Sequence, residues 1–486
     1  MKIVNHTSRG EGALSKRVVS AGIWATLQNL IREGVGFLVF IVLARFFLED
    51  DDFGIIAFSM ALLMVAHMFG QAGLNVLIIQ RDDVSARQLS ATFWFHLGIA
   101  IALCLLLFMA APLVKLLGGA PEIVPVVRVL SLGLPIAFAG FVHEAILQRK
   151  MQFRPLAIRR LVAVLISGGS AIIAAYLGAG LWSLVILNLV NSTVSTILLW
   201  WFVRWRPTLI NPLQDLKTLL PSGLEITSLS ITRFLGDFIE KGIIGFAIGV
   251  SQLGLFHVSE KMMRSLHLVL TQSINAVAMP AFSETQSDIE RTKGSFLTAL
   301  SVCVSLTTPV FLGVAAVAEP LMLFLLGDQW IAAGSLVFLL AIASSLSAPL
   351  FFVDPILIAI NQQRTAVKAT LVSQTVSLVC TSIGAFWGIV GVCIGVIVRQ
   401  VISNITMLLV MKRTVDLQVH EFVKAIQGPY LSGCLMMTCI LLPGIIWEES
   451  PGLLILILIG VVTYPLFLRL LDRQASDRLI QLIVRK

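Results

Sequence analysis

The sequence predicts an all-α integral membrane protein with about 14 transmembrane helices. Of its 486 residues, 57% are hydrophobic and only 13% are charged, and the mean hydropathy is +0.93. Soluble chains have about a quarter of their residues charged. Here the charges are spaced widely enough to leave apolar stretches of the ~20 residues that a helix needs to cross a membrane. These observations exclude a soluble enzyme, a nucleic-acid-binding domain and a disordered scaffold.

Fourteen apolar segments follow one another along the chain, each long enough to span the hydrocarbon core as a helix. The ~10-residue alternating segments of a membrane β-barrel do not occur. The first segment contains Arg32 and Glu33 and has no small-residue cleavage site, so we expect a helix rather than a cleaved signal peptide. The predicted segments are 18–46, 53–79, 88–111, 123–147, 156–178, 180–203, 218–249, 252–283, 294–317, 331–360, 365–386, 388–411, 421–445 and 452–470.

The loops between these segments differ in charge on the two sides of the membrane. With a cytoplasmic N-terminus, 26 of the 35 lysines and arginines lie on the cytoplasmic side and one, Lys115, lies on the other. The opposite side is acidic at 49–52 and 448–449. Because positively charged loops stay in the cytoplasm, we predict that both termini are cytoplasmic. The net charge of +8 then reflects membrane orientation and not binding to nucleic acid.

The chain shows signs of an internal duplication. A shift of 200 residues places His67 on His267 and Asn75 on Asn275, although matches this sparse also arise by chance. Helices 1–6 and 7–12 keep similar lengths, loop lengths and charge positions, as expected for a parallel repeat. We predict two six-helix lobes around a central cavity. The predicted parts are a cytoplasmic lead (1–17), the N-terminal lobe (18–205), the C-terminal lobe (206–411), and helices 13 and 14 with a cytoplasmic tail (412–486).

Charged residues inside the predicted helices are the candidate functional residues. A charge at a helix centre costs at least about 2.5–3.5 kcal/mol on insertion scales, so it usually faces the bundle interior or a wet cavity. Several of these residues recur at helical spacing on one face. The substrate-cavity candidates are Arg32, Glu33, Arg233, Asp237, Arg264, His267 and Arg399, and the ion-coupling candidates are Glu240, Glu260 and Asp354.

The same residues also have a structural interpretation. Arg233–Asp237 and Glu260–Arg264 could be ion pairs that only hold helices together, and His267 could be a packing residue. The sequence leaves both interpretations open.

Four arginines support the functional interpretation. Arg32 has no obvious partner, because Glu33 points about 100° away on the helix. If Arg32, Arg233, Arg264 and Arg399 share one cavity, that cavity is cationic. It would suit an anionic substrate, because a guanidinium group stays charged and binds phosphate through a planar fork of donors.

Catalytic and metal-binding patterns are missing from the sequence. It has no Walker A motif or Gly-rich phosphate loop, and no loop is large enough for a soluble domain. The six cysteines lie within apolar segments without metal-ligand spacing, so we expect no disulfides. We therefore expect a protein that is not an enzyme and that has no catalytic residues, cofactor or metal. Its energy would come from a gradient, from substrate asymmetry or from another protein.

Several stretches together resemble a known family. They include IVLARFF at 41–47, GLNVLIIQRDDVS at 73–85, LQRKMQFRPLA at 147–157 and AEPLMLFLLGDQW at 318–330. Their order and spacing over residues 15–330 are similar to those of bacterial polysaccharide exporters. These are the Wzx-type lipid-linked oligosaccharide flippases of the multidrug/oligosaccharidyl-lipid/polysaccharide superfamily, and the branch in question exports colanic acid and other exopolysaccharides.

The resemblance implies alternating access and movement of an undecaprenyl-pyrophosphate-linked sugar repeat unit across the bacterial inner membrane, for exopolysaccharide or lipopolysaccharide synthesis. It implies lipid-linked oligosaccharide and membrane lipids as partners, beside a polysaccharide polymerase or export complex. Members use Na⁺ or H⁺ gradients, and Glu240 fills the slot of an acidic residue found before the IG turn. A cation-coupled small-molecule exporter of the same superfamily is the alternative. A scaffold or a lipid-cycle enzyme fits less well, because buried charges occur in both halves and catalytic patterns are missing.

Overall fold

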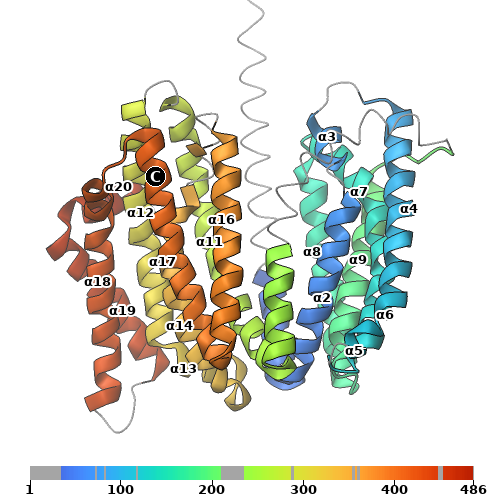
Figure 1. Cartoon of the computed structure of the whole chain (residues 1–486), viewed down its shortest axis with the longest axis horizontal. Helices are drawn as coiled ribbons and strands as arrows, with labels where there is room; N and C mark the ends of the chain where they lie inside the picture. Colours follow the sequence, from blue (N-terminus) through green and yellow to red (C-terminus); the bar gives the residue numbers. More distant parts are fainter. Residues whose placement is uncertain are drawn as a thin grey trace, which may run out of the picture. The chain divides into compact units, whose positions relative to one another are not determined.

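The computed structural model describes residues 34–71, 74–80, 84–116, 119–209, 235–285, 289–352, 356–357, 362–446 and 452–484. Within these ranges every regular element is a helix, so the all-α prediction is confirmed. The backbone forms two compact units, Met1–Lys241 (unit 1) and Gly242–Lys486 (unit 2). Figure 1 shows the helices of both units.

Unit 1 is a bundle of membrane-length helices with short connecting helices. The main packing partners are α8 with α9, α7 with α9 and α4 with α7. Its core includes Phe93, Val142 and Leu199 in one cluster and Leu134 and Phe138 in another. The helices are Gly34–Phe46, α2 (Asp50–Gln71), α3 (Leu74–Gln80), α4 (Ala86–Ala110), α5 (Leu113–Leu116), α6 (Ile123–Ser131), α7 (Gly133–Arg149), α8 (Phe153–Tyr176) and α9 (Trp182–Phe202).

Unit 2 has longer helices, and a helix over 235–247 crosses the boundary between the units. The closest helix pairs are α16 with α17, α12 with α18 and α18 with α19. The helices are α11 (Val250–Thr285), α12 (Ile289–Ala316), α13 (Ala318–Leu326), η1 (Asp328–Trp330), α14 (Ala332–Ser347), η2 (Ala348–Phe352), α16 (Gln363–Ala385), α17 (Gly388–Val415), α18 (Val419–Ile446), α19 (Leu453–Leu471) and α20 (Arg473–Val484).

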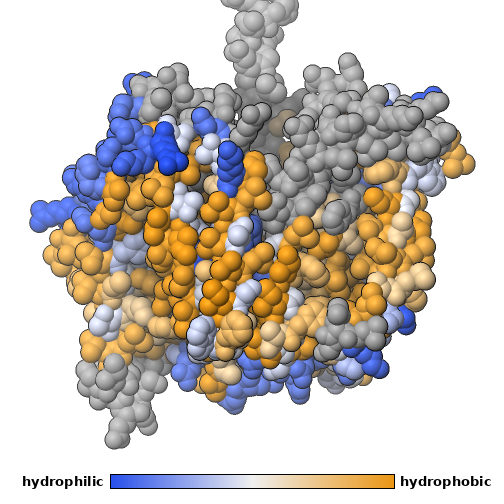
Figure 2. Space-filling view, viewed as in Figure 1, coloured by the Kyte–Doolittle hydropathy of each residue, from blue (hydrophilic) through white to orange (hydrophobic). Residues whose placement is uncertain are grey.

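Ten of the described helices are long and apolar enough to cross a membrane. Their outer surfaces are apolar as well: on α19, Leu454 is 81% exposed and Leu470 is 68% exposed. Figure 2 shows this hydrophobic surface on the face of unit 2 formed by α16 to α19, with hydrophilic residues gathered at the end near α20. Lipid is the environment that such a surface requires. The count of 14 spans stays a prediction, as do the lobe boundaries at 205 and 411.

Several predicted segments are interrupted in the structure. Segment 123–147 is divided into α6 and α7 at Leu132. Pro135 is the reason, because it has no N–H to donate to the carbonyl of Ser131. Segment 331–360 changes from α14 to the 3₁₀ helix η2 around Pro349. In addition, α20 is a helix in what the sequence predicts only as a cytoplasmic tail.

Prolines also leave backbone carbonyls without their usual helical donors, and tyrosines from neighbouring helices supply replacements. Pro309 cannot donate to the carbonyl of Ser305, and the Tyr464 hydroxyl of α19 donates to that oxygen at 2.8 Å. Pro349 likewise cannot donate to the carbonyl of Ser345. That oxygen accepts the backbone N–H of Ala348 and, at 2.8 Å, the Tyr430 hydroxyl of α18. A carbonyl inside a membrane protein is costly without a donor, so these bonds fix how the helices pack.

Unit 1 contains a third carbonyl that a proline deprives of its helical donor and that a side chain of another helix supplies. Pro112, just after α4, leaves the carbonyl of Phe108 without an N–H donor, and Nε of Arg128 from α6 donates to it at 3.2 Å. The Arg128 guanidinium also lies 5.0 Å from the centre of the Phe108 ring.

Candidate functional site

Four of the predicted site residues lie outside the described residues: Arg32, Glu33, Arg233 and Asp354. Of the four arginines expected to line a cationic cavity, Arg264 and Arg399 are described, and both belong to unit 2. Whether all four share one cavity therefore stays a prediction.

Arg264 and Glu260 form an ion pair within α11. The distance from Nη2 of Arg264 to Oε1 of Glu260 is 2.8 Å, and the arginine side chain is 49% exposed. The pair joins successive turns of one helix, as the i,i+4 spacing predicts. Half-exposed charges of opposite sign stabilise a helix by about 0.2–0.5 kcal/mol, so the pair by itself adds little to the stability of α11.

His267 lies about one turn beyond Arg264 on α11, against aromatic rings from two other elements. Its ring centre is 4.4 Å from that of Phe351 in η2 and 5.8 Å from that of Phe311 in α12. His67, its counterpart in unit 1, lies edge-on against Phe138 and Phe141, at 5.0 Å and 5.1 Å. These ring contacts fit the packing interpretation of both histidines.

Arg399 is part of a polar seam between α16 and α17. Its Nη1 atom donates to the Ser377 hydroxyl at 2.7 Å, and the hydroxyls of Ser373 and Ser403 lie 3.2 Å apart one turn further along. Asn404 extends the seam to α14 by donating to the carbonyl of Leu346 at 2.7 Å. Polar side chains in a membrane helix usually face other helices in this way. The seam gives Arg399 a polar environment between two helices.

Asp237 and Glu240 both lie on the helix over 235–247 and are half-buried, followed directly by the buried Lys241. The structure therefore keeps these charges within one turn of each other. The possible ion pair of Asp237 with Arg233 lies outside the described residues.

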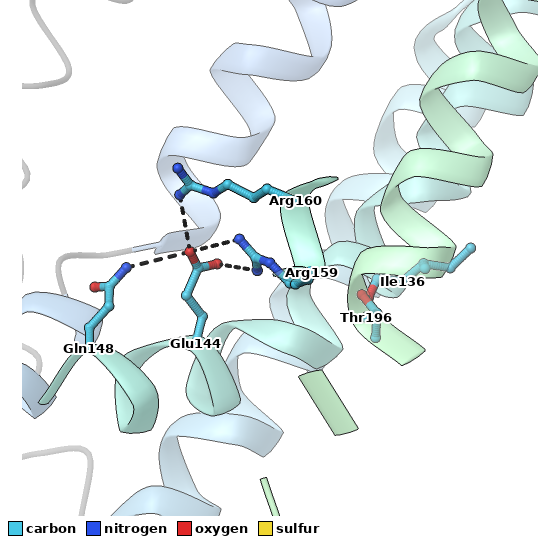
Figure 3. Close-up of polar contacts among 6 residues, drawn as sticks. All are labelled: Ile136, Glu144, Gln148, Arg159, Arg160 and Thr196. Atoms are coloured by element: carbon cyan, nitrogen blue, oxygen red, sulfur yellow. Dashed lines mark hydrogen bonds and ion pairs between the residues drawn. The ribbon is translucent and has the colours of Figure 1, made fainter. Parts of the chain in front are cut away.

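Unit 1 contains a charged cluster around Glu144 that the sequence interpretation missed. Oε2 of Glu144 on α7 accepts a bond from Nη1 of Arg159 on α8 at 2.9 Å, and Oε1 accepts from Nη2 at 3.1 Å. Nη2 of Arg160 lies 3.5 Å from Oε1, and Nε2 of Gln148 lies 3.4 Å from it. Figure 3 shows the Glu144 carboxylate surrounded by these three side chains.

The electrostatics of this Glu144 cluster favour an anion nearby. Arg159 is 6% exposed, so its charge is buried and balanced by Glu144 in a two-bond pair. Arg160 adds a second positive charge beside the same carboxylate. One carboxylate between two guanidinium groups leaves the cluster with a net positive charge at the end of unit 1 that the sequence predicts to be cytoplasmic.

One sequence signal and one feature of the turn point to this cluster. Glu144 is an acidic residue inside the apolar segment 123–147. Met151, in the turn between α7 and α8, has a left-handed φ of 53°. Glu144 precedes Met151 by about as many residues as Arg159 follows Met151. Residues equally far from a tight turn face each other in an antiparallel hairpin. Arg159 is one of the residues that charge placement predicts to be cytoplasmic, and the structure adds that its side chain is buried against Glu144.

Trp200 and Thr196 fix α9 against α7 beside the cluster. The Thr196 hydroxyl donates to the carbonyl of Ile136 at 2.8 Å, also drawn in Figure 3, and Nε1 of Trp200 donates to the carbonyl of Ala139 at 2.9 Å. The His143 ring stacks on Trp200 at 4.7 Å. These contacts hold the helix that carries Glu144. Within the described parts of the chain, no three His, Cys, Asp or Glu side chains gather as a metal ion requires.

Comparison with known proteins places this arrangement in a family. The profile described as "Polysaccharide biosynthesis protein" matches residues 42–335. The succinoglycan biosynthesis transport protein ExoT of Rhizobium meliloti (strain 1021) is 27% identical over 366 residues, covering 75% of this chain and 74% of that protein. The lipopolysaccharide biosynthesis protein WzxC of Escherichia coli (strain K12) is 24% identical over 406 residues, covering 83% of this chain and 82% of that protein.

Solved structures share the fold at low sequence identity. The lipid II flippase MurJ in an inward closed conformation has a TM-score of 0.77 and 14% identity, covering 94% of this chain and 99% of that one. An inward-facing multidrug resistance transporter of the MATE family has a TM-score of 0.60 and 17% identity, covering 80% of this chain and 94% of that one.

The resemblance to Wzx-type exporters that the sequence motifs indicate is confirmed by these comparisons. The profile match extends over more than half of the sequence, and the relatives align along most of their own length. The chain therefore belongs to the polysaccharide biosynthesis protein family.

Proposed function

We propose that this protein is a transporter that moves a lipid-linked sugar precursor across the membrane for the synthesis of a surface or exported polysaccharide. The observation that carries the proposal is the alignment with ExoT, which is named a succinoglycan biosynthesis transport protein, along 75% of this chain and 74% of that one. The fold adds support, because it is more similar to that of a lipid II flippase than to that of a multidrug transporter.

The finer form of the proposal follows the sequence prediction. The cargo is an undecaprenyl-pyrophosphate-linked repeat unit, which moves by alternating access from the cytoplasmic to the periplasmic leaflet of the bacterial inner membrane. A sugar pyrophosphate cannot cross lipid alone, because its polar groups would lose water without gaining partners. A cationic cavity supplies those partners while the prenyl tail stays in the bilayer. The protein itself catalyses no reaction, and a Na⁺ or H⁺ gradient through Glu240, Glu260 or Asp354 drives the cycle.

The polar groups of unit 2 support this mechanism. Arg399 and its serine partners form a hydrogen-bonded seam between α16 and α17, whose outer face is hydrophobic. Interior charge and hydroxyl groups of this kind mark substrate and ion pathways in membrane proteins. A polysaccharide polymerase or export complex would receive the repeat units on the far side.

The test is a strain that lacks this gene and has no second copy. Its lipids are extracted and analysed by mass spectrometry for a prenyl-pyrophosphate-linked oligosaccharide, and its surface polysaccharide is measured in parallel. We expect the lipid-linked unit to accumulate and the polymer to disappear, with recovery when the gene is supplied on a plasmid. Normal polymer without accumulation, together with new sensitivity to cationic drugs, would show a small-molecule exporter instead.

A further inference from the structure

A second polar region lies in unit 2, away from the residues discussed above. A cavity of about 730 Å³ lies where α12, α18, the end of α19 and α20 meet. The sequence predicts that this end of the helices faces the cytoplasm. Its charged and titratable lining residues are His420, Glu421, Lys424, Asp472 and Arg478.

Both acidic residues of the cavity are already engaged. Oε1 of Glu421 pairs with Nζ of Lys293 at 3.3 Å, and its Oε2 accepts the backbone N–H of Gln418 at 2.9 Å. Oδ1 of Asp472 accepts the backbone N–H of Ala475 at 3.0 Å, which caps the start of α20. The Lys293 pair offsets the charge of Glu421, whereas the Asp472 carboxylate keeps its charge and is held in position by the backbone bond.

The two cations of the cavity have no such partner. Lys424 on α18 and Arg478 on α20 make no hydrogen bond or ion pair with any side chain that the structure describes. They line the same cavity from different helices. An anion that enters between them therefore finds donors that the protein itself does not use.

Apolar side chains border the cavity on the membrane side. Leu431 is 55% exposed and Leu471 is 50% exposed, and both line the cavity beside its cations. Figure 2 shows hydrophilic residues gathered at the α20 end of unit 2, above the hydrophobic surface of α17 to α19. A ligand that fits this border has a charged end and an apolar end.

The position of α20 is built into the packing. A Cβ atom on Gly428 would lie 2.5 Å from Cβ of Asp472, so only glycine lets the start of α20 approach α18 this closely. Ala475 and Ser476 are buried in the first turns of α20. Arg478 is therefore held at the cavity by a docked helix and does not extend freely into solvent.

We propose that this cavity binds the phosphate-bearing headgroup of an anionic phospholipid from the cytoplasmic leaflet. The phosphate lies between Lys424 and Arg478, and an acyl chain runs past Leu431 and Leu471. Basic pockets between membrane helices on the cytoplasmic side recognise anionic lipids by this combination of charge and apolar surface. The cavity lies within one unit, so its occupation does not depend on which cargo the transporter moves.

The experiment measures binding of phosphatidylglycerol to the purified full-length protein in detergent by native mass spectrometry. The cavity variant is Lys424→Gln with Arg478→Gln. The matched control is Lys412→Gln with Arg413→Gln, which removes the same charge from exposed positions at the end of α17. We expect about 30-fold weaker binding of the first lipid for the cavity variant, and a change within about twofold for the control.

Three outcomes overturn the proposal. Equal losses in both double variants mean diffuse attraction to the basic surface. Competition by phosphatidylcholine as strong as that by phosphatidylglycerol means that charge is not recognised. Displacement of the lipid by millimolar inorganic phosphate means a site for a free anion. Photoactivatable phosphatidylglycerol on the wild-type protein gives a test that needs no variant. We expect cross-links within 420–431 and 471–478, and cross-links confined to other helices contradict the assignment.

Discussion

Glu144 and Arg159 illustrate how single residues connect sequence and packing in this protein. Their two-bond pair is buried between α7 and α8, with distances of 2.9 Å and 3.1 Å. Removing one partner of a buried pair leaves the other charge uncompensated. Replacing both partners by apolar groups is often neutral. The pair therefore matters more for how the hairpin is specified than for net stability.

This reasoning gives a prediction for Glu144→Gln. Loss of the carboxylate should destabilise unit 1 by about 3–5 kcal/mol, because Arg159 stays buried without a counter-charge. The measurement is the thermal unfolding midpoint of the purified protein in detergent. The double variant Glu144→Leu with Arg159→Met should recover most of the loss. Glu290→Gln is the control, since that carboxylate is 77% exposed and its pair with Lys293 at 3.6 Å contributes at most about 1 kcal/mol. An unchanged midpoint for Glu144→Gln contradicts the prediction.

Arg32 and Arg233 give a second prediction at the residue scale, on transport itself. Each should contact the anionic cargo if the cationic cavity exists. Arg32→Ala and Arg233→Ala should therefore each lower polysaccharide export at least about tenfold while the protein still inserts. The reason is that a hydrogen bond to a charged group contributes about 1.5–3 kcal/mol. Complementation of the deletion strain measures export, and immunoblots of membranes measure protein level. Arg45→Ala is the control, because this exposed arginine lies 5.6 Å from the Phe46 ring centre and is expected to reach the interface. Wild-type export by both variants at normal levels removes them from the site.

At the scale of helices, prolines and tyrosines decide which elements pack together. Pro309 frees the carbonyl of Ser305 in α12, and Tyr464 of α19 donates to it. A similar relation links Pro349, Ser345 and Tyr430 between α14 and α18, where the Ser345 carbonyl also accepts the N–H of Ala348. Each bond lies in an apolar interior where water cannot replace the donor. The proline and the tyrosine therefore act as one unit across the two helices.

A double-variant cycle tests this pairing. Tyr464→Phe should lower the unfolding free energy by about 1–3 kcal/mol, because the carbonyl of Ser305 loses its donor while the ring still packs. Pro309→Ala restores an N–H at the position that completes the helix, so the loss caused by Tyr464→Phe should shrink in that background. The readout is the shift in unfolding midpoint for the four proteins. Strictly additive shifts show that the two residues act independently.

At the scale of the whole molecule, charge asymmetry predicts the orientation in the membrane. The acidic residues at the start of α2, among them Asp50, are predicted to face the periplasm, and the basic end of α17 is predicted to face the cytoplasm. A membrane-impermeant thiol reagent on intact cells with a permeable outer membrane should therefore label Asp50→Cys and not Arg413→Cys. After lysis both should react, and the parent protein gives the background from its six native cysteines. The opposite labelling pattern reverses the topology.

Composition and charge placement were enough to predict the helical membrane fold, because a bilayer restricts a spanning chain to few structures. They also located the charged candidates, since a charge in an apolar segment is visible without a structure. Glu260 and Arg264 could be paired by spacing alone because both lie on one helix. Ser377, the partner of Arg399, could not be identified, because it comes from a different helix.

The sequence by itself therefore determined the helical class and the family, and it predicts the orientation. All three depend on local composition and order along the chain. Only the tertiary structure decided which helices are neighbours. It buried Arg159 against Glu144, brought Tyr464 to the carbonyl that Pro309 leaves free, and folded α20 onto α18 at Gly428. Each of these contacts joins residues of different helices. Their geometry is set by side-chain packing between helices, which the pattern within any one helix does not contain.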